Sequence, residues 1–286
     1  MAIRSPIEWG WDQLKDAAQG VGSASTDEQH MRPGARAVPA IRRIRVDDLR
    51  IVLRKGLDDF AANRTDVIFL CVIYPVVGLM LAHLAFGHGL LPLLFPFAAG
   101  FALVGPVAAI GLNEMSRRRE LGESVGWTDA FGVLRSPSIG AIVLLSLLLI
   151  AMFLLWMAAA SVIYRVTLGP GFPTSAGAFV RDVFTTSAGW ALIALGVGVG
   201  FLFAVAVLAI SVISFPMLLD RNVRFEVAVA TSMRAVRANP GPMAAWGVIV
   251  AAGLVLGSIP FLLGLAIVLP VLGHATWHLY RRLVPR

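Results

Sequence analysis

The sequence contains long stretches without Asp, Glu, Lys or Arg, and these stretches constrain the fold more than any other feature. A helix needs about 20 residues to cross ~30 Å of hydrocarbon. With 58% hydrophobic and only 14% charged residues, the composition excludes a soluble globular protein. We therefore predict an all-α polytopic membrane helix bundle with six transmembrane helices. The expected spans are residues 67–86, 90–112, 139–166, 190–219, 243–257 and 261–280.

The last two spans come from one apolar stretch, residues 243–280, which is too long for a single crossing. Gly257, Ser258, Ile259 and Pro260 interrupt it near its middle. We read this break as a tight hairpin. A short turn at residues 87–89 joins the first two spans, and an outer loop around residues 167–188 joins the third and fourth. The prediction is therefore three helical hairpins.

Six spans place both termini on the same side of the membrane, and the basic residues indicate which side. With both termini cytoplasmic, 22 of the 24 Lys and Arg residues fall on the cytoplasmic side, as the positive-inside rule requires. The exceptions are Arg165 and Arg181, at or within the expected outer loop. The basic surplus is then explained by topology and by anionic lipid headgroups, and no nucleic-acid partner is expected.

The N-terminal region differs from the rest of the chain. Residues 1–40 hold a short amphipathic pattern followed by a polar linker that contains Gly and Pro, without an apolar segment typical of a signal peptide. We therefore expect two regions: a cytoplasmic N-terminal tail with a flexible linker over residues 1–40, and a six-span membrane domain over residues 41–286.

Each pair of spans is expected to follow an amphipathic cytoplasmic helix. The first copy ends at Asn63, the middle copy covers Trp127–Arg135, and the third ends at Asn239, which suggests three helix-plus-hairpin units. Such helices could lie at the headgroup boundary or pack together as a cytoplasmic collar. In the first copy, Leu49, Val52, Leu53, Gly56 and Phe60 share one face, and Arg50, Arg54, Asp58 and Asp59 are expected to point away from it.

His274 and His278 are the strongest candidates for a cofactor site. They lie four residues apart in the sixth span, so their imidazoles share one helix face and could hold a metal or a haem. No carboxylate or cysteine is near them in the sequence, and His83 would lie about 15 Å away in depth, at 1.5 Å per residue. Trp277 and Tyr280 flank the pair, which favours an interfacial aromatic belt instead.

The rest of the sequence offers few residues suited to transport, catalysis or metal binding. No span carries an interior Asp, Glu, Lys or Arg, which argues against ion-coupled transport. No nucleophile with a base and an orienting group can be assembled from the loops, so no catalytic residues and no metal site are predicted. The glycine pairs Gly196–Gly200 and Gly253–Gly257 favour close helix packing.

Several residues are expected to contact the membrane interface or a partner. Arginines and aromatic residues at the cytoplasmic ends of spans anchor a helix in the headgroup region. The residues in question are Arg117, Arg118, Arg119, Trp277, Tyr280, Arg281 and Arg282.

Two segments resemble a known family. The segment Ser214–Asp220, followed by Ala228, Ser232 and residues 238–240, is the first, and Leu269–Arg281 is the second and more specific one. Together they resemble a bacterial family of predicted integral membrane proteins of unassigned function, some of whose members carry a cytochrome c oxidase subunit label. The resemblance covers roughly residues 41–286 and implies a multi-pass protein of the bacterial inner membrane.

The oxidase label does not fit a catalytic subunit, because a haem-copper subunit needs about a dozen spans and six metal-binding histidines, and this chain has five histidines. We predict a non-enzymatic scaffold, accessory or assembly factor that contacts the bilayer and a respiratory or other membrane complex. The alternatives are a redox accessory protein associated with cytochrome c oxidase, or a carrier of apolar or lipidic molecules.

Overall fold

The computed structural model describes residues 39–63, 76, 78–80, 83, 91–169, 171, 173, 175–260 and 262–285. Every regular element in this described part is a helix, which agrees with the predicted all-α class. The helices are α2 (Asp48–Ala62), α5 (Leu91–Ala108), α6 (Ile110–Glu120), η3 (Trp127–Arg135), α7 (Ile139–Thr167), α8 (Ala176–Thr185), α9 (Ser187–Ser211), α10 (Ser214–Asp220), α11 (Phe225–Ala238), α12 (Pro240–Ser258) and α13 (Leu265–Leu283).

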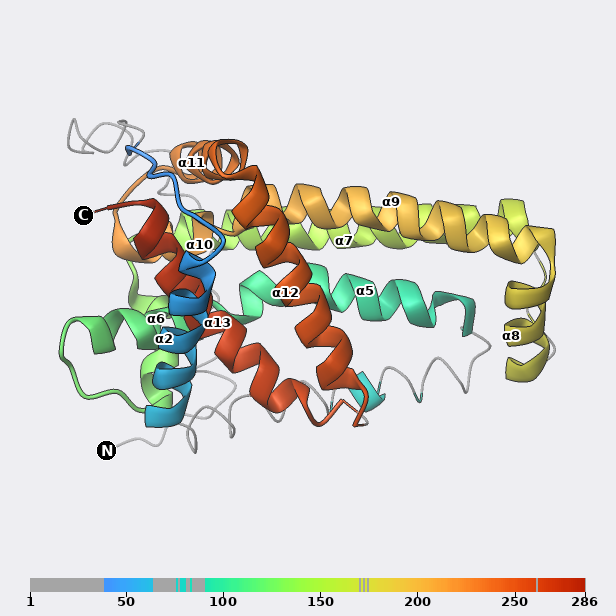
Figure 1. Ribbon diagram of the computed structural model, residues 1–286, viewed down its shortest axis with the longest axis horizontal. Coiled ribbons are helices and arrows are strands. Elements are labelled where there is room, and N and C mark those ends of the chain that lie inside the picture. The colour runs from blue at the N-terminus through green and yellow to red at the C-terminus, as the bar shows by residue number, and fades with distance from the viewer. Residues whose placement is uncertain are drawn as a thin grey trace, which may run out of the picture.

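The molecule is elongated, with α5, α7 and α9 running along its long axis (Figure 1). At one end α2, α6, η3, α10, α11 and the carboxyl-terminal half of α13 gather into a globular region, which we call the head. At the other end α8 lies across the helix ends. Within the described residues, three helical segments are long and apolar enough to span a membrane: Ile139–Thr167, Ser187–Asp220 and Pro240–Ser258.

These three segments correspond to the predicted spans 139–166, 190–219 and 243–257. The predicted span 190–219 is not one straight helix, however, because α9 ends at Ser211 and α10 begins at Ser214. At this bend the backbone amide of Ile213 donates to the hydroxyl of Ser232 on α11, 3.2 Å away. The bend turns the chain into the head and ties it to α11.

The predicted span 90–112 is divided in the structure. The first helix, α5, ends at Ala108, two residues after Pro106, and the next helix, α6, begins at Ile110. Proline has no amide hydrogen and its ring clashes with the turn before it, so Pro96 and Pro106 each weaken α5 on their amino-terminal side. The predicted span 67–86 lies almost entirely outside the described residues.

The predicted break between the last two spans is present. Helix α12 ends at Ser258 and α13 begins at Leu265, and the two pack closely where Gly257 meets Gly264. A Cβ on Gly264 would lie 2.8 Å from the backbone of Gly257, so the contact requires glycine. Close packing is thus confirmed for Gly253 and Gly257, whereas Gly196 on α9 faces open space.

Helix α2 packs against α13 through its apolar face. Leu49, Val52 and Gly56 are buried, and a Cβ on Gly56 would come within 2.7 Å of the Ala275 backbone. The expectation that Asp59 points away from this face is wrong, because Asp59 is 7% exposed and lies on the buried side. The spacing of Val52, Gly56 and Asp59 places all three on one helix face.

The middle and third copies of the expected cytoplasmic helix appear as η3 and α11. The middle copy is a 3₁₀ helix over the expected residues Trp127–Arg135, and α11 ends before Asn239. The Asn239 amide accepts a hydrogen bond from the backbone of Ile44 at 2.8 Å and donates to the carbonyl of Arg42 at 3.2 Å. It therefore holds the segment that precedes α2 against α11.

Candidate functional site

The polar side chains of the head converge on Asp59. One carboxylate oxygen, Oδ2, lies 2.6 Å from the hydroxyl of Ser116 on α6 and 2.8 Å from Nε2 of His278 on α13. The other oxygen lies 3.3 Å from the guanidinium of Arg119. The Ser116 hydroxyl is also 2.8 Å from Nδ1 of His274. We call Asp59, Ser116, His274 and His278 the buried cluster.

The chemistry of the acceptors determines where the protons lie. An ionised carboxylate only accepts hydrogen bonds, so Ser116 and the Nε2–H of His278 both donate to Asp59. The single hydroxyl proton of Ser116 is then used, and Ser116 accepts from the Nδ1–H of His274. This leaves Nε2 of His274 as an unprotonated atom, buried and without a hydrogen-bond partner in the described part.

These hydrogen bonds control the ionisation of Asp59. Burial acts to raise the pKa of the carboxyl group, but the hydrogen bonds from His278 and Ser116 outweigh it and bring the pKa below the usual 3.8. Asp59 is thus a stable anion near neutral pH, and it links α2, α6 and α13.

The buried cluster brings together a serine, a histidine and an aspartate, which the sequence did not predict. It does not have the arrangement of a hydrolase, in which the serine donates its proton to a histidine and remains open to substrate. Here the serine proton goes directly to Asp59, and Ser116 and His274 are each only 1% exposed. The cluster therefore connects helices and leaves no nucleophile open to a substrate.

A second network joins α13 to α6 and α10. The indole Nε1 of Trp277 donates to Glu120 at 2.8 Å, and the Tyr280 hydroxyl donates to Asp220 at 2.6 Å. Arg281 binds both carboxylates, at 3.1 Å and 3.3 Å. An aromatic belt would expose these rings to the bilayer, whereas Trp277 is 1% exposed and Tyr280 is fully buried within the chain.

The three arginines of α6 are also used inside the head. Arg117 and Arg118 bind the buried Glu114 at 2.7 Å and 2.9 Å, and Arg118 also binds Asp129 of η3 at 2.7 Å. Burial acts to raise the pKa of Glu114, but the hydrogen bonds from the two arginines bring it below its usual 4.5. Arg119 donates to the backbone oxygen of Asp58 at 2.8 Å.

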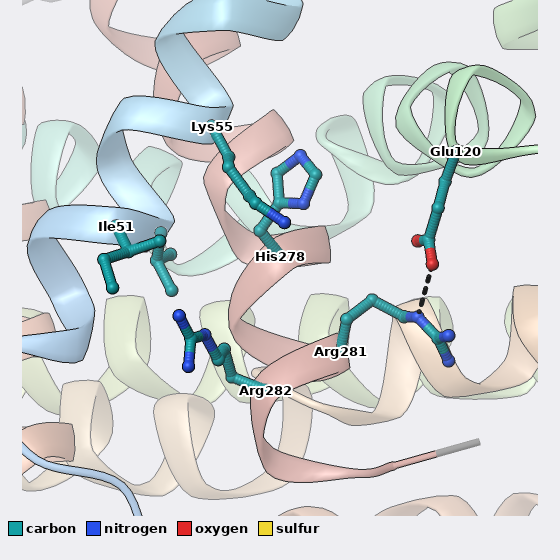
Figure 2. A pocket seen from close by; sticks show the side chains of 7 residues that line it. Ile51, Lys55, Glu120, His278, Arg281 and Arg282 are labelled. Atoms are coloured by element: carbon teal, nitrogen blue, oxygen red, sulfur yellow. Dashed lines mark hydrogen bonds and ion pairs between the residues drawn. The ribbon is translucent and has the colours of Figure 1, made fainter. Parts of the chain in front are cut away.

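An open cleft of about 160 Å³ lies between α2 and α13. Lys55 reaches into it from α2, and Arg281 and Arg282 border it from α13 beside His278 (Figure 2). Arg282 is held at 3.2 Å by Asp48, whereas Lys55 makes no hydrogen bond or ion pair with the described residues. Ile51, Val52 and Glu120 complete the lining.

The structure thus places all seven predicted interface residues in ion pairs or hydrogen bonds within the head, and Arg281 and Arg282 also line the cleft. Sequence reasoning missed the acidic partners, which are Asp48, Asp59, Glu114, Glu120, Asp129 and Asp220. One signal could have found Asp59, since it lies seven residues after Val52 on the apolar face of α2. The other partners carry no local signal, because they come from helices distant in sequence.

The two candidate histidines do come together at one site, but each uses one ring nitrogen in a hydrogen bond of the buried cluster. Among the described residues, no group of three His, Cys, Asp or Glu side chains has an arrangement that could hold a metal ion. His83, the third histidine considered for this site, is exposed. A haem or metal at His274 and His278 stays a prediction.

Comparison with known proteins identifies a family for part of the chain. Residues 94–220 match the family model described as predicted integral membrane protein (DUF2189), which bears out the resemblance predicted from the sequence. The match covers α5 to α10 and does not reach the segment Leu269–Arg281. Comparison with curated proteins and with solved structures gave no match.

Proposed function

We propose that this integral membrane protein is a non-enzymatic accessory or scaffold protein of a bacterial inner-membrane complex. In this proposal six spans form three hairpins, the head lies in the cytoplasm with both termini, and the apolar surface of the spans contacts a partner membrane protein. The proposal is supported by the position of the basic segments, by the exposure of the spans, and by the pairing of the polar groups with each other inside the head.

The position of the basic segments supports this orientation. The head contains the segments that hold Arg117–Arg119, residues 220–242 and Arg281–Arg282, whereas Arg181 lies on α8 at the opposite end (Figure 1). The two ends of the described chain meet there as well, because the amide of Arg42 donates to the carbonyl of Leu283 at 2.8 Å. The positive-inside rule assigns such an end to the cytoplasm.

The exposure of α9 is the observation that carries the proposal. In the most apolar stretch of the segment Ser187–Asp220, only 6% of the residues are buried within the chain. Phe201 and Leu202 on α9 are 65% and 66% exposed. A carrier needs spans that enclose a path, and a membrane enzyme needs spans that enclose a site. A helix with so much uncovered surface is instead suited to lateral contact with another membrane protein or with lipid.

The polar groups of the head support a non-enzymatic role. The buried cluster and the ion pairs around Glu114 and Glu120 use charged side chains to join helices to each other. Hydrogen-bonded networks of this kind hold the helices of the head in fixed positions. A rigid cytoplasmic region on an exposed membrane anchor fits an accessory or assembly role.

The test is a pull-down of the tagged full-length protein from its native membrane in mild detergent, with mass spectrometry of the co-eluting proteins. We expect one membrane complex in near-stoichiometric amount. A preparation that contains only the chain and lipid would contradict the scaffold proposal.

Two matched variants locate the contact. The double substitution Phe201→Ala and Leu202→Ala removes exposed side chains from α9, and Leu154→Ala with Leu155→Ala removes similarly exposed side chains from α7. We expect the α9 pair to lower the yield of the partner more than the α7 pair, because α9 is less covered by the rest of the chain. Equal yields from both variants and the wild type would exclude α9 as the contact.

The two alternatives predict different results. A redox accessory protein would give a purified preparation with a haem absorption band that is lost in the His274→Ala variant. A carrier of apolar molecules would show ordered lipid-like density between its spans and no stoichiometric protein partner.

A further inference from the structure

The cleft between α2 and α13 has more hydrogen-bond donors than acceptors. Arg281 and Arg282 each carry five N–H groups and Lys55 carries three, against one lining carboxylate, Glu120. Glu120 already accepts from Trp277 and Arg281. The cleft therefore has an excess of hydrogen-bond donors and of positive charge.

The nearby carboxylates do not remove this imbalance. Asp48 accepts from Arg282 at 3.2 Å and from the backbone amide of Arg45 at 2.8 Å. Asp59 is used by Ser116, Arg119 and His278. Lys55 is thus left as a cation without a partner in the described part. The guanidinium of Arg282 is held by a single ion pair, with Asp48.

The cations come from two elements that are fixed relative to each other. Lys55 lies on α2 next to Gly56, where α2 touches the backbone of α13 at Ala275. Arg282 lies on α13, held by Asp48 at the start of α2. Binding an anion between them would require little rearrangement, which lowers its cost.

We propose that this cleft binds a phosphate group, either of a phospholipid headgroup or of a small soluble phosphate compound. Lys55 contacts its oxygens from α2 and Arg282 contacts them from α13, while His278 and Arg281 border the site (Figure 2). Arginine forks and lysine ammonium groups are the usual protein donors to phosphate. The cleft, at about 160 Å³, has room for one phosphate group.

The test measures binding to the purified full-length protein by native mass spectrometry and uses two probes. One probe is dioleoyl phosphatidic acid, compared with dioleoyl phosphatidylcholine, and the other is inorganic phosphate added as a competitor. Preferential binding of phosphatidic acid that phosphate does not displace assigns a lipid headgroup. Displacement by inorganic phosphate assigns a soluble phosphate compound.

The variants are Lys55→Gln alone and together with Arg282→Gln. Each substitution removes one cation of the cleft, and we expect each substitution to weaken binding by about tenfold, since it loses a charge-assisted hydrogen bond. Lys55 has no partner in the described part, so its substitution is expected to leave the melting temperature unchanged and keeps the test independent of folding.

The matched control is Arg54→Gln, which removes the same charge from the neighbouring residue of α2. Arg54 is exposed and does not line the cleft, so we expect less than about a twofold change in affinity. The proposal is overturned if neither probe binds, or if Arg54→Gln weakens binding as much as Lys55→Gln does.

Discussion

At the scale of single residues, Asp59 connects three helices of the head. Its carboxylate accepts hydrogen bonds from α6 and α13 while its own helix is α2, so one side chain holds three elements together. Each of these elements is distant from the others in sequence. Loss of the charge should therefore loosen the whole head.

We predict that Asp59→Asn lowers the free energy of unfolding by about 1–3 kcal/mol, because an amide presents only one acceptor oxygen where the carboxylate presents two. The measurement is thermal unfolding of the purified protein in detergent. The control is Asp58→Asn at the adjacent exposed position, where the carboxylate makes no ion pair in the described part and little change is expected. Equal losses in the two variants would contradict the role of Asp59.

The pH dependence follows from the lowered pKa of Asp59. Its ionised form contributes stability that is fully present above the usual 3.8 of an unfolded chain and is lost as the pH falls through the lower pKa of the folded state. The difference in melting temperature between wild type and Asp59→Asn should therefore shrink as the pH falls below about 3.8. A difference that grew below this pH would disprove this assignment.

At the scale of elements, the contact between α2 and α13 depends on Gly56. A methyl group there would lie 2.7 Å from the backbone of Ala275, which cannot rotate away as a side chain could. The two helices would have to separate. The cleft that contains Lys55 and Arg282 would change with them.

We predict that Gly56→Ala destabilises the protein, because overpacking costs about 1–3 kcal/mol and outweighs the gain of about 1 kcal/mol in helix propensity. The matched control is Gly196→Ala on α9, where an added Cβ meets no atom within 4 Å and the propensity gain is expected alone. Thermal unfolding of both variants provides the comparison. A Gly56→Ala protein as stable as the Gly196→Ala protein would refute the close contact.

Much of the element structure could be predicted from the sequence. The apolar run 139–166 became α7, and the short middle copy became η3 over the expected residues. The divisions at Ala109 and Val212 were not predicted, because a run of apolar residues gives the length of a segment and does not report a bend within it. Likewise, the face of α2 was recognised, but its partner α13 was not, since hydrophobic periodicity does not say which helix covers a face.

The candidate site was harder to predict for the same reason. His274 and His278 were found from their spacing, whereas Asp59 and Ser116 lie far from them in sequence and join them only in the folded chain. The arginines of α6 were assigned to the headgroup region, because their buried partner Glu114 looks like one more charge of a polar loop.

At the scale of the whole molecule, the head and α8 should lie on opposite sides of the membrane. In a Cys71→Ser background, we predict that the Arg181→Cys variant reacts with a membrane-impermeant maleimide in intact spheroplasts. The Arg135→Cys variant in the exposed part of η3 should react only after lysis. The reverse pattern would place the head outside and contradict the proposed orientation.

The central claim is that the chain works as part of a larger membrane complex, with the uncovered surface of α9 against a partner. The most direct test is the mass of the particle extracted from the native membrane into lipid nanodiscs without detergent. The account predicts a particle well above one 30.5 kDa chain with its lipid, containing a second polypeptide in fixed ratio. Particles that hold a single copy of this chain and lipid alone would contradict it.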